Sequence, residues 1–320
     1  MTMESYTIQE AARLLGVGED QVRHTLQDLA AKNPTLSGKE PLTKDTVEAV
    51  RQALRGAKPA PAAGKQGATV FCVTSGKGGV GKTAFAVNTA VEFARRGYRT
   101  IVVDADLGLA NAHILGGVKP AKTLSDLLDK KAELHEIIVD GPGGAKFVSG
   151  GSGVAEMANL DDAGRKRIVD AVQALKPYCD IVVIDTGAGV SKAVTDFVAI
   201  SDHTIVVTTS NFAAIADAYG IVKIMVQEGY RRSMHLVVNR VRSPEEAEQV
   251  FKKLKGCTER FLSFDLNWLG LLPEDTSVEG AVTKRSPFCE SFPNSVATRY
   301  LKKVVTSLER FLPVLAGRTG

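Results

Sequence analysis

The sequence is short of several features that would assign it to a class of protein. Only four of its 320 residues are cysteines, which lie far apart and form no C-x-x-C pair: Cys72, Cys179, Cys257 and Cys289. We therefore expect reduced thiols, with neither a disulfide framework nor a zinc site. No apolar run approaches the ~18 residues of a membrane-spanning helix, and the first residues do not resemble a signal peptide. These absences predict a cytoplasmic protein.

The charge and the apolar content are close to the averages for globular proteins. Hydrophobic residues make up 44% of the chain, charged residues make up 24%, and the formal net charge is +4. This composition excludes a wholly disordered or collagen-like chain. The mild positive charge permits contact with nucleic acid or anionic lipid but argues for neither.

A segment without bulky apolar residues divides the chain. Residues 57–67 consist only of Ala, Lys, Pro, Gly and Gln, so they cannot bury a core and are interpreted as a linker. The linker separates a small head, residues 1–56, from a large body, residues 68–320.

The head is predicted to be an all-α domain that contains a helix-turn-helix. Its apolar spacing predicts helices over residues 7–15, 19–31 and 43–54. Residues 6–17 resemble the opening of MerR-type winged domains, which insert their second helix into the DNA major groove. That helix would offer Gln21, Arg23, His24 and Gln27.

The charge of the head favours a different use. The head has seven basic and eight acidic residues, a net charge of −1, whereas DNA-binding modules are normally basic on one face. Glu19 and Asp20 would also repel phosphates at the start of the second helix. DNA binding and protein docking both stay open for the head, and protein docking is favoured.

The body alternates apolar runs with amphipathic helices. Strands are expected at Thr69–Thr74, Thr100–Val103, Lys146–Val148, Ile181–Ile184, Thr204–Thr208, His235–Val238 and Trp268–Leu271. Continuous apolar runs are typical of parallel strands buried on both faces, so we predict an α/β fold with a doubly wound, mostly parallel sheet. The ligand site of such a sheet lies beyond the carboxyl ends of its strands.

A phosphate-binding loop follows the first of these strands. The pattern G-x-x-x-x-G-K-S/T is met by Gly76, Lys77, Gly78, Gly79, Val80, Gly81, Lys82 and Thr83. Backbone N–H groups of such a loop surround phosphate oxygens at the start of a helix. We expect Lys82 to bridge the β- and γ-phosphates and the Thr83 hydroxyl to bind Mg²⁺.

The second lysine of the loop gives the pattern K-G-G-x-G-K-T, which resembles the deviant Walker A ATPases of the MinD/ParA group. The resemblance implies an ATP-dependent homodimer in which Lys77 reaches the phosphates of the partner subunit. A cation supplied in trans would neutralise charge in the transition state and make hydrolysis depend on dimerisation. Lys77 and Lys82 are therefore candidate catalytic residues.

Three aspartates follow strands of the predicted sheet. Asp185 ends the apolar run 181–184 in the Walker B form and is expected to hold Mg²⁺. By resemblance, Asp106 is the third catalytic residue, which orients the attacking water, and Asp104 lies near the metal. The alternative, that Asp104 and Asp106 only cap the next helix, stays open.

The predicted base site comes from two later strands. Asn239 ends one of them, and Pro273 and Glu274 follow the other. The resemblance implies that these residues surround the adenine, with the Asn amide at the edge of the base and the Pro loop over its face. The sequence has no Asn/Thr-Lys-x-Asp signature of a GTP site, so the expected ligands are ATP and Mg²⁺.

Within the group, D-A-D-L-G-L-A-N over 104–111 is similar to FlhG (FleN) regulators of flagellar number and placement. The resemblance implies a slow, partner-stimulated ATPase whose protein partner is a flagellar GTPase or a transcriptional activator. FlhG proteins usually begin with a D-Q-A-x-x-L-R helix, of which residues 9–15 keep little, so the head suits a different partner. A ParA-type partition ATPase and an ATP-controlled transcriptional regulator are the alternatives.

Two further features allow two interpretations each. Ser295–Leu312 is amphipathic and suits either a helix packed on the sheet or a peripheral helix at a membrane or cell pole. Basic residues of the body suit either a nonspecific DNA surface or a solvated face: Arg231, Arg232, Arg240, Arg242, Lys252, Lys253 and Lys255. The packed helix and the solvated face are favoured.

Overall fold

The computed structural model describes residues 5–15, 19–32, 41–56, 67–106, 110–151 and 160–313. The chain forms two compact units, Met1–Ala62 and Ala63–Gly320. The predicted linker, residues 57–67, lies almost wholly outside the described residues.

Three helices and two short strands make up the described part of the first unit. These are β1 (Ser5–Tyr6), α1 (Ile8–Leu15), α2 (Glu19–Lys32), β2 (Leu42–Thr43) and α3 (Lys44–Gly56). Helix α1 begins with a capping box, because the backbone N–H of Glu10 donates to the Thr7 hydroxyl and that of Thr7 donates to the Glu10 carboxylate. The all-α prediction is wrong in one respect, since β1 and β2 pair antiparallel. These strands have two residues each, too few for an alternating pattern to appear in the sequence.

The second unit is built on an eight-stranded sheet with the order β10-β9-β8-β3-β7-β4-β6-β5. Its strands are β3 (Thr69–Ser75), β4 (Thr100–Ala105), β5 (Val139–Asp140), β6 (Lys146–Val148), β7 (Ile181–Ala188), β8 (His203–Thr208), β9 (Met234–Val241) and β10 (Asn267–Pro273). All seven expected strands are present and pair in parallel. Only β5 was not expected, and it pairs antiparallel with β6.

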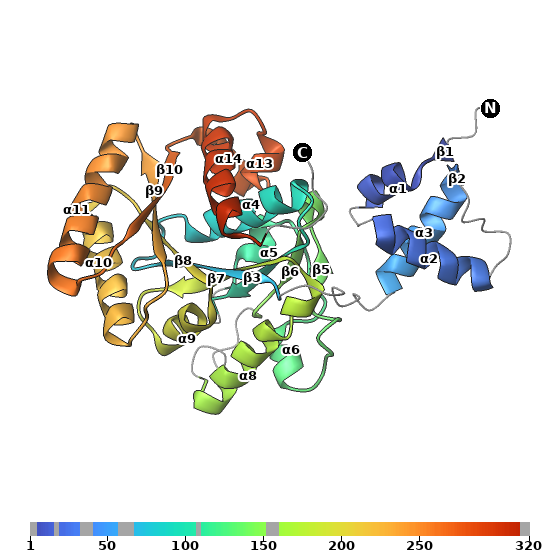
Figure 1. Ribbon diagram of the computed structural model, residues 1–320, viewed down its shortest axis with the longest axis horizontal. Helices are drawn as coiled ribbons and strands as arrows, with labels where there is room; N and C mark the ends of the chain where they lie inside the picture. Colours follow the sequence, from blue (N-terminus) through green and yellow to red (C-terminus); the bar gives the residue numbers. More distant parts are fainter. Residues whose placement is uncertain are drawn as a thin grey trace. The chain divides into compact units, whose positions relative to one another are not determined.

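Helices cover both faces of the sheet (Figure 1). They are α4 (Lys82–Arg95), α5 (Ala112–Leu115), α6 (Leu124–Leu128), α8 (Asp162–Gln173), α9 (Lys192–Ile200), α10 (Phe212–Gln227), α11 (Pro244–Leu262), α12 (Thr276–Thr283), α13 (Phe288–Ser291) and α14 (Val296–Leu308). Three short 3₁₀ turns complete the described part, η1 (Pro142–Gly144), η2 (Lys176–Tyr178) and η3 (Glu309–Phe311). No described helix is long and apolar enough to cross a membrane.

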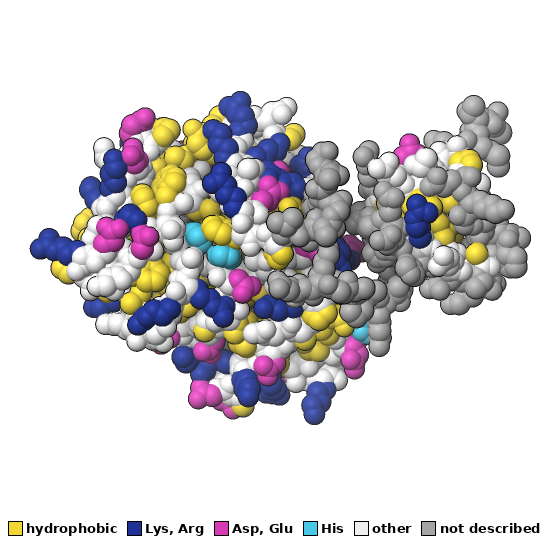
Figure 2. Space-filling view, in the orientation of Figure 1, with side chains coloured by type: hydrophobic (Ala, Val, Ile, Leu, Met, Phe, Trp, Pro, Cys, Tyr) yellow, Lys and Arg dark blue, Asp and Glu magenta, His cyan; other side chains and the backbone are white. Residues whose placement is uncertain are grey.

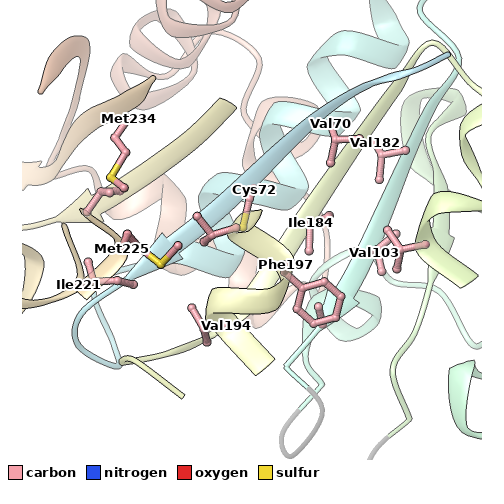
Figure 3. Packing of buried hydrophobic residues seen from close by; sticks show 14 of the residues in the cluster. Val70, Cys72, Val103, Val182, Ile184, Val194, Phe197, Ile221, Met225 and Met234 are labelled. Carbon is pink, nitrogen blue, oxygen red and sulfur yellow. The ribbon is translucent and has the colours of Figure 1, made fainter. Parts of the chain in front are cut away.

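The apolar core is divided into two layers by the sheet. Alternate residues of β3 enter different layers: Val70 and Cys72 join one, and Phe71 and Val73 join the other. In the first layer, Phe197 of α9 lies with residues of several strands (Figure 3). Both faces of the central strands are therefore buried from solvent, which explains why their sequences are continuously apolar.

The last helix is packed, as favoured from the sequence. Leu301, Val304, Val305 and Leu308 of α14 are buried in the second layer of the core. The apolar face of α14 is therefore already occupied within the body.

An arginine ties the end of α4 to the C-terminal helix. The guanidinium of Arg96 donates to the Glu92 and Glu309 carboxylates, to the Thr306 hydroxyl and to the carbonyl of Lys302. The helix that follows the phosphate loop is thus fixed at its far end to α14.

Several basic residues of the body lie far apart or form ion pairs. Arg231 precedes β9 and Arg242 follows it, so the eight residues of this strand, about 26 Å, separate them. Lys252 pairs with Glu248, and Lys255 pairs with Asp265 among others. Figure 2 shows Lys and Arg side chains scattered among acidic ones over this face, which agrees with the solvated-face interpretation.

Candidate functional site

The phosphate loop connects the end of β3 with the first residue of α4. Gly79 and Gly81 have left-handed backbones, with φ of 78° and 90°. At Gly76, a Cβ atom would lie 2.1 Å from the backbone of Asp217 in α10, so only glycine fits there. Val80 is buried and anchors the loop, whereas Lys77, Gly78 and Gly79 are exposed. The loop therefore presents its central residues to solvent from a fixed base.

Beneath the loop lies a buried ion pair. Lys82 Nζ is 2.7 Å from Asp185 Oδ1, and both side chains are buried. Burial raises the pKa of Asp185, and Lys82 opposes this rise. The second oxygen, Asp185 Oδ2, is buried and has no hydrogen-bond partner among the described residues. This carboxylate therefore keeps one acceptor that no described residue uses.

A second buried carboxylate is the neighbour of Asp185 across the sheet. Asp104 pairs with Asp185 in the register of β4 and β7. Its pKa is raised to about 7, chiefly by burial and then by the charge of Asp185. The backbone N–H groups of Asp106 and Ala112 donate to Asp104, at 3.2 and 2.7 Å. Asp104 thus caps the first turn of α5, as the alternative interpretation expected, while lying next to Asp185.

Asp106 lies at the carboxyl end of the same sheet, beside β7. A Cβ atom on Gly187 would be 3.6 Å from Asp106 Oδ1, an ordinary van der Waals distance, which places the carboxylate beside the end of β7. The sheet therefore brings together Asp104, Asp106 and Asp185 from two adjacent strands. The next three residues, 107–109, which belong to the D-A-D-L-G-L-A-N pattern, lie outside the described residues.

The residues fit a nucleotide-bound Mg²⁺ better than a metal held by protein alone. Within the described ranges, no group of three or more His, Cys, Asp or Glu side chains could hold a metal ion. Mg²⁺ usually keeps several waters and binds one or two carboxylates together with phosphate oxygens. The free oxygen of Asp185 meets that need, and Thr83 follows Lys82 at the start of α4.

The predicted adenine residues lie next to the phosphate loop. Asn239 Nδ2 donates to the carbonyl of Val80 at 2.8 Å, and a Cβ on Gly81 would lie 2.3 Å from the same nitrogen. Asn239 Oδ1 accepts from the N–H of Arg240. The amide nitrogen thus uses one of its two N–H groups within the protein, and the amide oxygen uses one of its two lone pairs. The second N–H and the second lone pair can bind a ligand.

Pro273 and Glu274 reach the same place from β10. Pro273 pairs with Val241 in the register of β9 and β10, and the N–H of Glu274 donates to the Val241 carbonyl at 2.9 Å. The structure therefore brings the three predicted adenine residues to adjacent strand ends. It leaves Lys77 apart from them, exposed at the top of the loop.

Sequence reasoning missed two supports of the loop. The carbonyl of Ser75 accepts from the N–H of Gly189, and the hydroxyl oxygen of Thr186 lies within hydrogen-bond distance of the Val73 carbonyl, at 3.3 Å, and of the Thr74 hydroxyl, at 3.2 Å. These bonds join β3 to β7 below the phosphate loop. The Asp-Thr-Gly that follows the apolar run of β7 was the available signal.

Comparison with known proteins shows the family of the chain. Residues 71–288 match the family described as the CobQ/CobB/MinD/ParA nucleotide binding domain. The chain belongs to this family. The antiactivator FleN of Pseudomonas aeruginosa is 35% identical over 251 residues, 78% of this chain and 89% of FleN. The flagellum site-determining protein YlxH of Helicobacter pylori is 32% identical over 75% of this chain and 81% of YlxH.

The fold is similar to that of a solved MinD protein. The septum site-determining protein MinD of Pyrococcus horikoshii, complexed with Mg-ADP, superposes with a TM-score of 0.64. The match covers 76% of this chain and 97% of that structure at 22% identity, so it supports the fold alone. The resemblance to MinD/ParA ATPases and to FleN is confirmed, and residues 1–56 are not part of the family match.

Proposed function

We propose that this MinD/ParA ATPase is an ATP-driven dimerisation switch of the FlhG type. It is monomeric when empty or ADP-bound and forms a two-fold dimer with Mg-ATP. The observation that carries the proposal is the pair of lysines in one loop. Lys82 is buried against Asp185, whereas Lys77 is exposed and does not share that contact. A lysine displayed in this way is suited to act on phosphates held by another subunit.

Each predicted residue then has a role in the ATP site. The backbone of residues 76–81 surrounds the phosphates, and Lys82 neutralises them from inside. Asp185 and Thr83 hold Mg²⁺, with Asp104 behind them, and the metal supplies charge neutralisation at the phosphate oxygens. Asp106 orients the attacking water from the end of β4, beside Gly187.

The biological role that we propose is the control of flagellar number or placement. It rests on the similarity to an antiactivator, FleN, and to a flagellum site-determining protein, YlxH. Hydrolysis would be slow and stimulated by a protein partner. The protein would act in the cytoplasm, or peripherally at a membrane or cell pole.

The head is proposed to be a helix-turn-helix module that recruits the specific partner. The arrangement of α1, α2 and α3 with the β1–β2 pair supports a small winged domain. Its net charge of −1 favours a protein partner, such as a transcriptional activator, over operator DNA. Removal of residues 1–56 should preserve ATP binding and dimerisation and abolish recruitment. Loss of ATP affinity on this truncation would instead make the head a part of the nucleotide switch.

The experiment that tests the switch uses Asp106→Ala, with Lys82→Ala as its matched control. Asp106→Ala should bind ATP but hydrolyse it very slowly, so that dimers accumulate in size-exclusion chromatography with Mg-ATP. Lys82→Ala should remain monomeric, because the phosphates lose their central cation and its charge-assisted hydrogen bonds. If Asp106→Ala is monomeric with ATP while the wild type dimerises, Asp106 is a structural residue. If Lys82→Ala binds ATP as the wild type does, the phosphate loop has been assigned wrongly.

A further inference from the structure

Arg240 has a backbone conformation that is unusual for its place in the fold. Its φ is +54°, in the left-handed region that residues other than Gly, Asn and Asp rarely adopt. In the described part of the chain, three other non-glycine residues have positive φ: Lys130, Ser263 and Arg285. Those three follow the ends of helices, where this conformation is common. Arg240 instead lies inside the strand β9.

The residue forms a bulge between β9 and β10. Leu272 pairs with Asn239, but the next residue of β10, Pro273, pairs with Val241. Arg240 is therefore the extra residue of its strand, and such bulges redirect neighbouring side chains. The bulge lies opposite a proline, which has no N–H to donate to the strand pairing.

The side chain that precedes the bulge is held against the phosphate loop. Asn239 Oδ1 accepts from the Arg240 N–H at 2.9 Å, while Asn239 Nδ2 donates to Val80 O at 2.8 Å. Both bonds are made by the side chain that immediately precedes the bulge, and the second reaches the loop that would hold the phosphates. Gly81 leaves just enough room for this amide, since a Cβ there would lie 2.3 Å from Nδ2.

We propose that the left-handed backbone of Arg240 is a positioning device for ATP binding. It orients the Asn239 amide toward the phosphate loop. The side chain that would contact the adenine base is thereby held in a fixed position relative to the loop that would bind the phosphates. Arg240 acts through Asn239 and not through its own guanidinium, which is exposed. This inference rests on the proposed ATP site and adds a residue to it whose role no motif indicates.

The test separates backbone shape from side-chain chemistry. Arg240→Gly keeps the left-handed conformation at no steric cost, whereas Arg240→Val disfavours it strongly because valine is β-branched. Arg240→Val should weaken ATP binding about tenfold in calorimetry, and Arg240→Gly should restore affinity to within about twofold of the wild type. Ser263→Val is the matched control, because Ser263 has a φ of +50° at the end of α11. It should lower the melting temperature but leave ATP affinity unchanged.

Three outcomes would overturn the proposal. If Arg240→Gly binds as weakly as Arg240→Val, the guanidinium itself contacts the ligand. If Arg240→Val binds ATP normally, the bulge does not position Asn239. If Ser263→Val loses the same affinity, general destabilisation explains the effect. Wild-type protein that does not bind ATP would instead refute the proposed function, which keeps the two failures distinct.

Discussion

The two ends of the strands in the main sheet differ in how their polar groups are used. We call the side where the parallel strands end the carboxyl edge, and the side where they begin the amino edge. The carboxyl edge holds the phosphate loop, the unpartnered Asp185 oxygen and the left-handed Arg240. It also exposes 86% of Phe212, the first residue of α10. Each of these features costs stability in an isolated chain. A surface of this kind is suited to a ligand and a second subunit, which would cover it.

The amino edge has the opposite character. Arg99 and Asp180 form an ion pair there at 2.8 Å. His203 and His235, at the starts of β8 and β9, lie together under Phe311, whose ring centroid is 4.4 Å from the first ring and 4.7 Å from the second. Polar and aromatic groups at this edge are thus paired within the chain. The comparison indicates that contacts at the amino edge stabilise the fold, whereas groups at the carboxyl edge lower its stability and are suited to binding.

The largest expected effect is the loss of ATP hydrolysis when the exposed lysine of the carboxyl edge is removed, with the fold left intact. Lys77→Ala should bind ATP nearly normally but lose about 10³-fold or more in hydrolysis, as removal of a trans-acting cation does. ATP turnover and calorimetry measure the two quantities separately. In a mixture with Lys82→Ala, one complete site per dimer should form, because the Lys82→Ala subunit donates its Lys77 to an ATP-loaded partner. Mixtures that stay inactive at every ratio, despite proven association, would argue against action in trans.

The second effect concerns pH and the amino edge. Burial, together with His203, lowers the pKa of His235 to about 4. In the unfolded chain the His235 imidazole takes up a proton near pH 6.5, whereas in the folded chain it does so only near pH 4. Because the unfolded state binds this proton more tightly, lowering the pH favours unfolding. Between pH 7.5 and 5 this residue should lower the free energy of unfolding by about 2 kcal/mol. Urea titrations at both pH values measure the loss.

The variant His235→Phe is the control for this pH dependence. It keeps an aromatic ring under Phe311 and removes the titrating group, so its stability should fall less between the two pH values. Buried carboxylates such as Asp104 titrate in both proteins and cancel in the comparison. Equal losses in the wild type and in His235→Phe would show that His235 is not responsible.

The smallest effect tests how much the aromatic contact contributes at the amino edge. Phe311 is only partly buried, so Phe311→Ala should lower the free energy of unfolding by about 1–2 kcal/mol, less than for a core phenylalanine. Phe261→Ala is the control, because Phe261 is 64% exposed on α11 and should cost little. ATP affinity should be unchanged in both. A change in ATP affinity with Phe311→Ala would mean that the two edges are not independent.

Much of the fold was predictable because its signals are local. The apolar run of β7 ends in Asp185, and the glycines and lysines of the phosphate loop follow β3, so both strands and the site between them could be located. The strand β5 was missed because its two residues span only one period of the alternating pattern, too few for the pattern to repeat. The contacts of Phe311 with His203 and His235 were not predictable either, since over 70 residues separate the ring from both histidines.

Two other features of the site depend on tertiary structure in the same way. The bulge at Arg240 arises from pairing with β10, and nothing in the residues Asn-Arg-Val demands a left-handed backbone. The pairing of Lys82 with Asp185 joins residues 103 positions apart. The motifs identified both side chains, but they did not predict that the two pair with each other.

Helix α4 connects the phosphate loop mechanically to the C-terminal helix through Arg96. The helix has 14 residues, so it is a rod about 21 Å long, with the phosphate loop at one end and the Arg96 bonds to α14 at the other. A tilt of about three degrees at the loop would move the far end by about 1 Å, enough to disturb hydrogen bonds of 2.8–2.9 Å. A movement of the phosphate loop would therefore be transmitted along α4 to the contacts of Arg96 with the C-terminal helix.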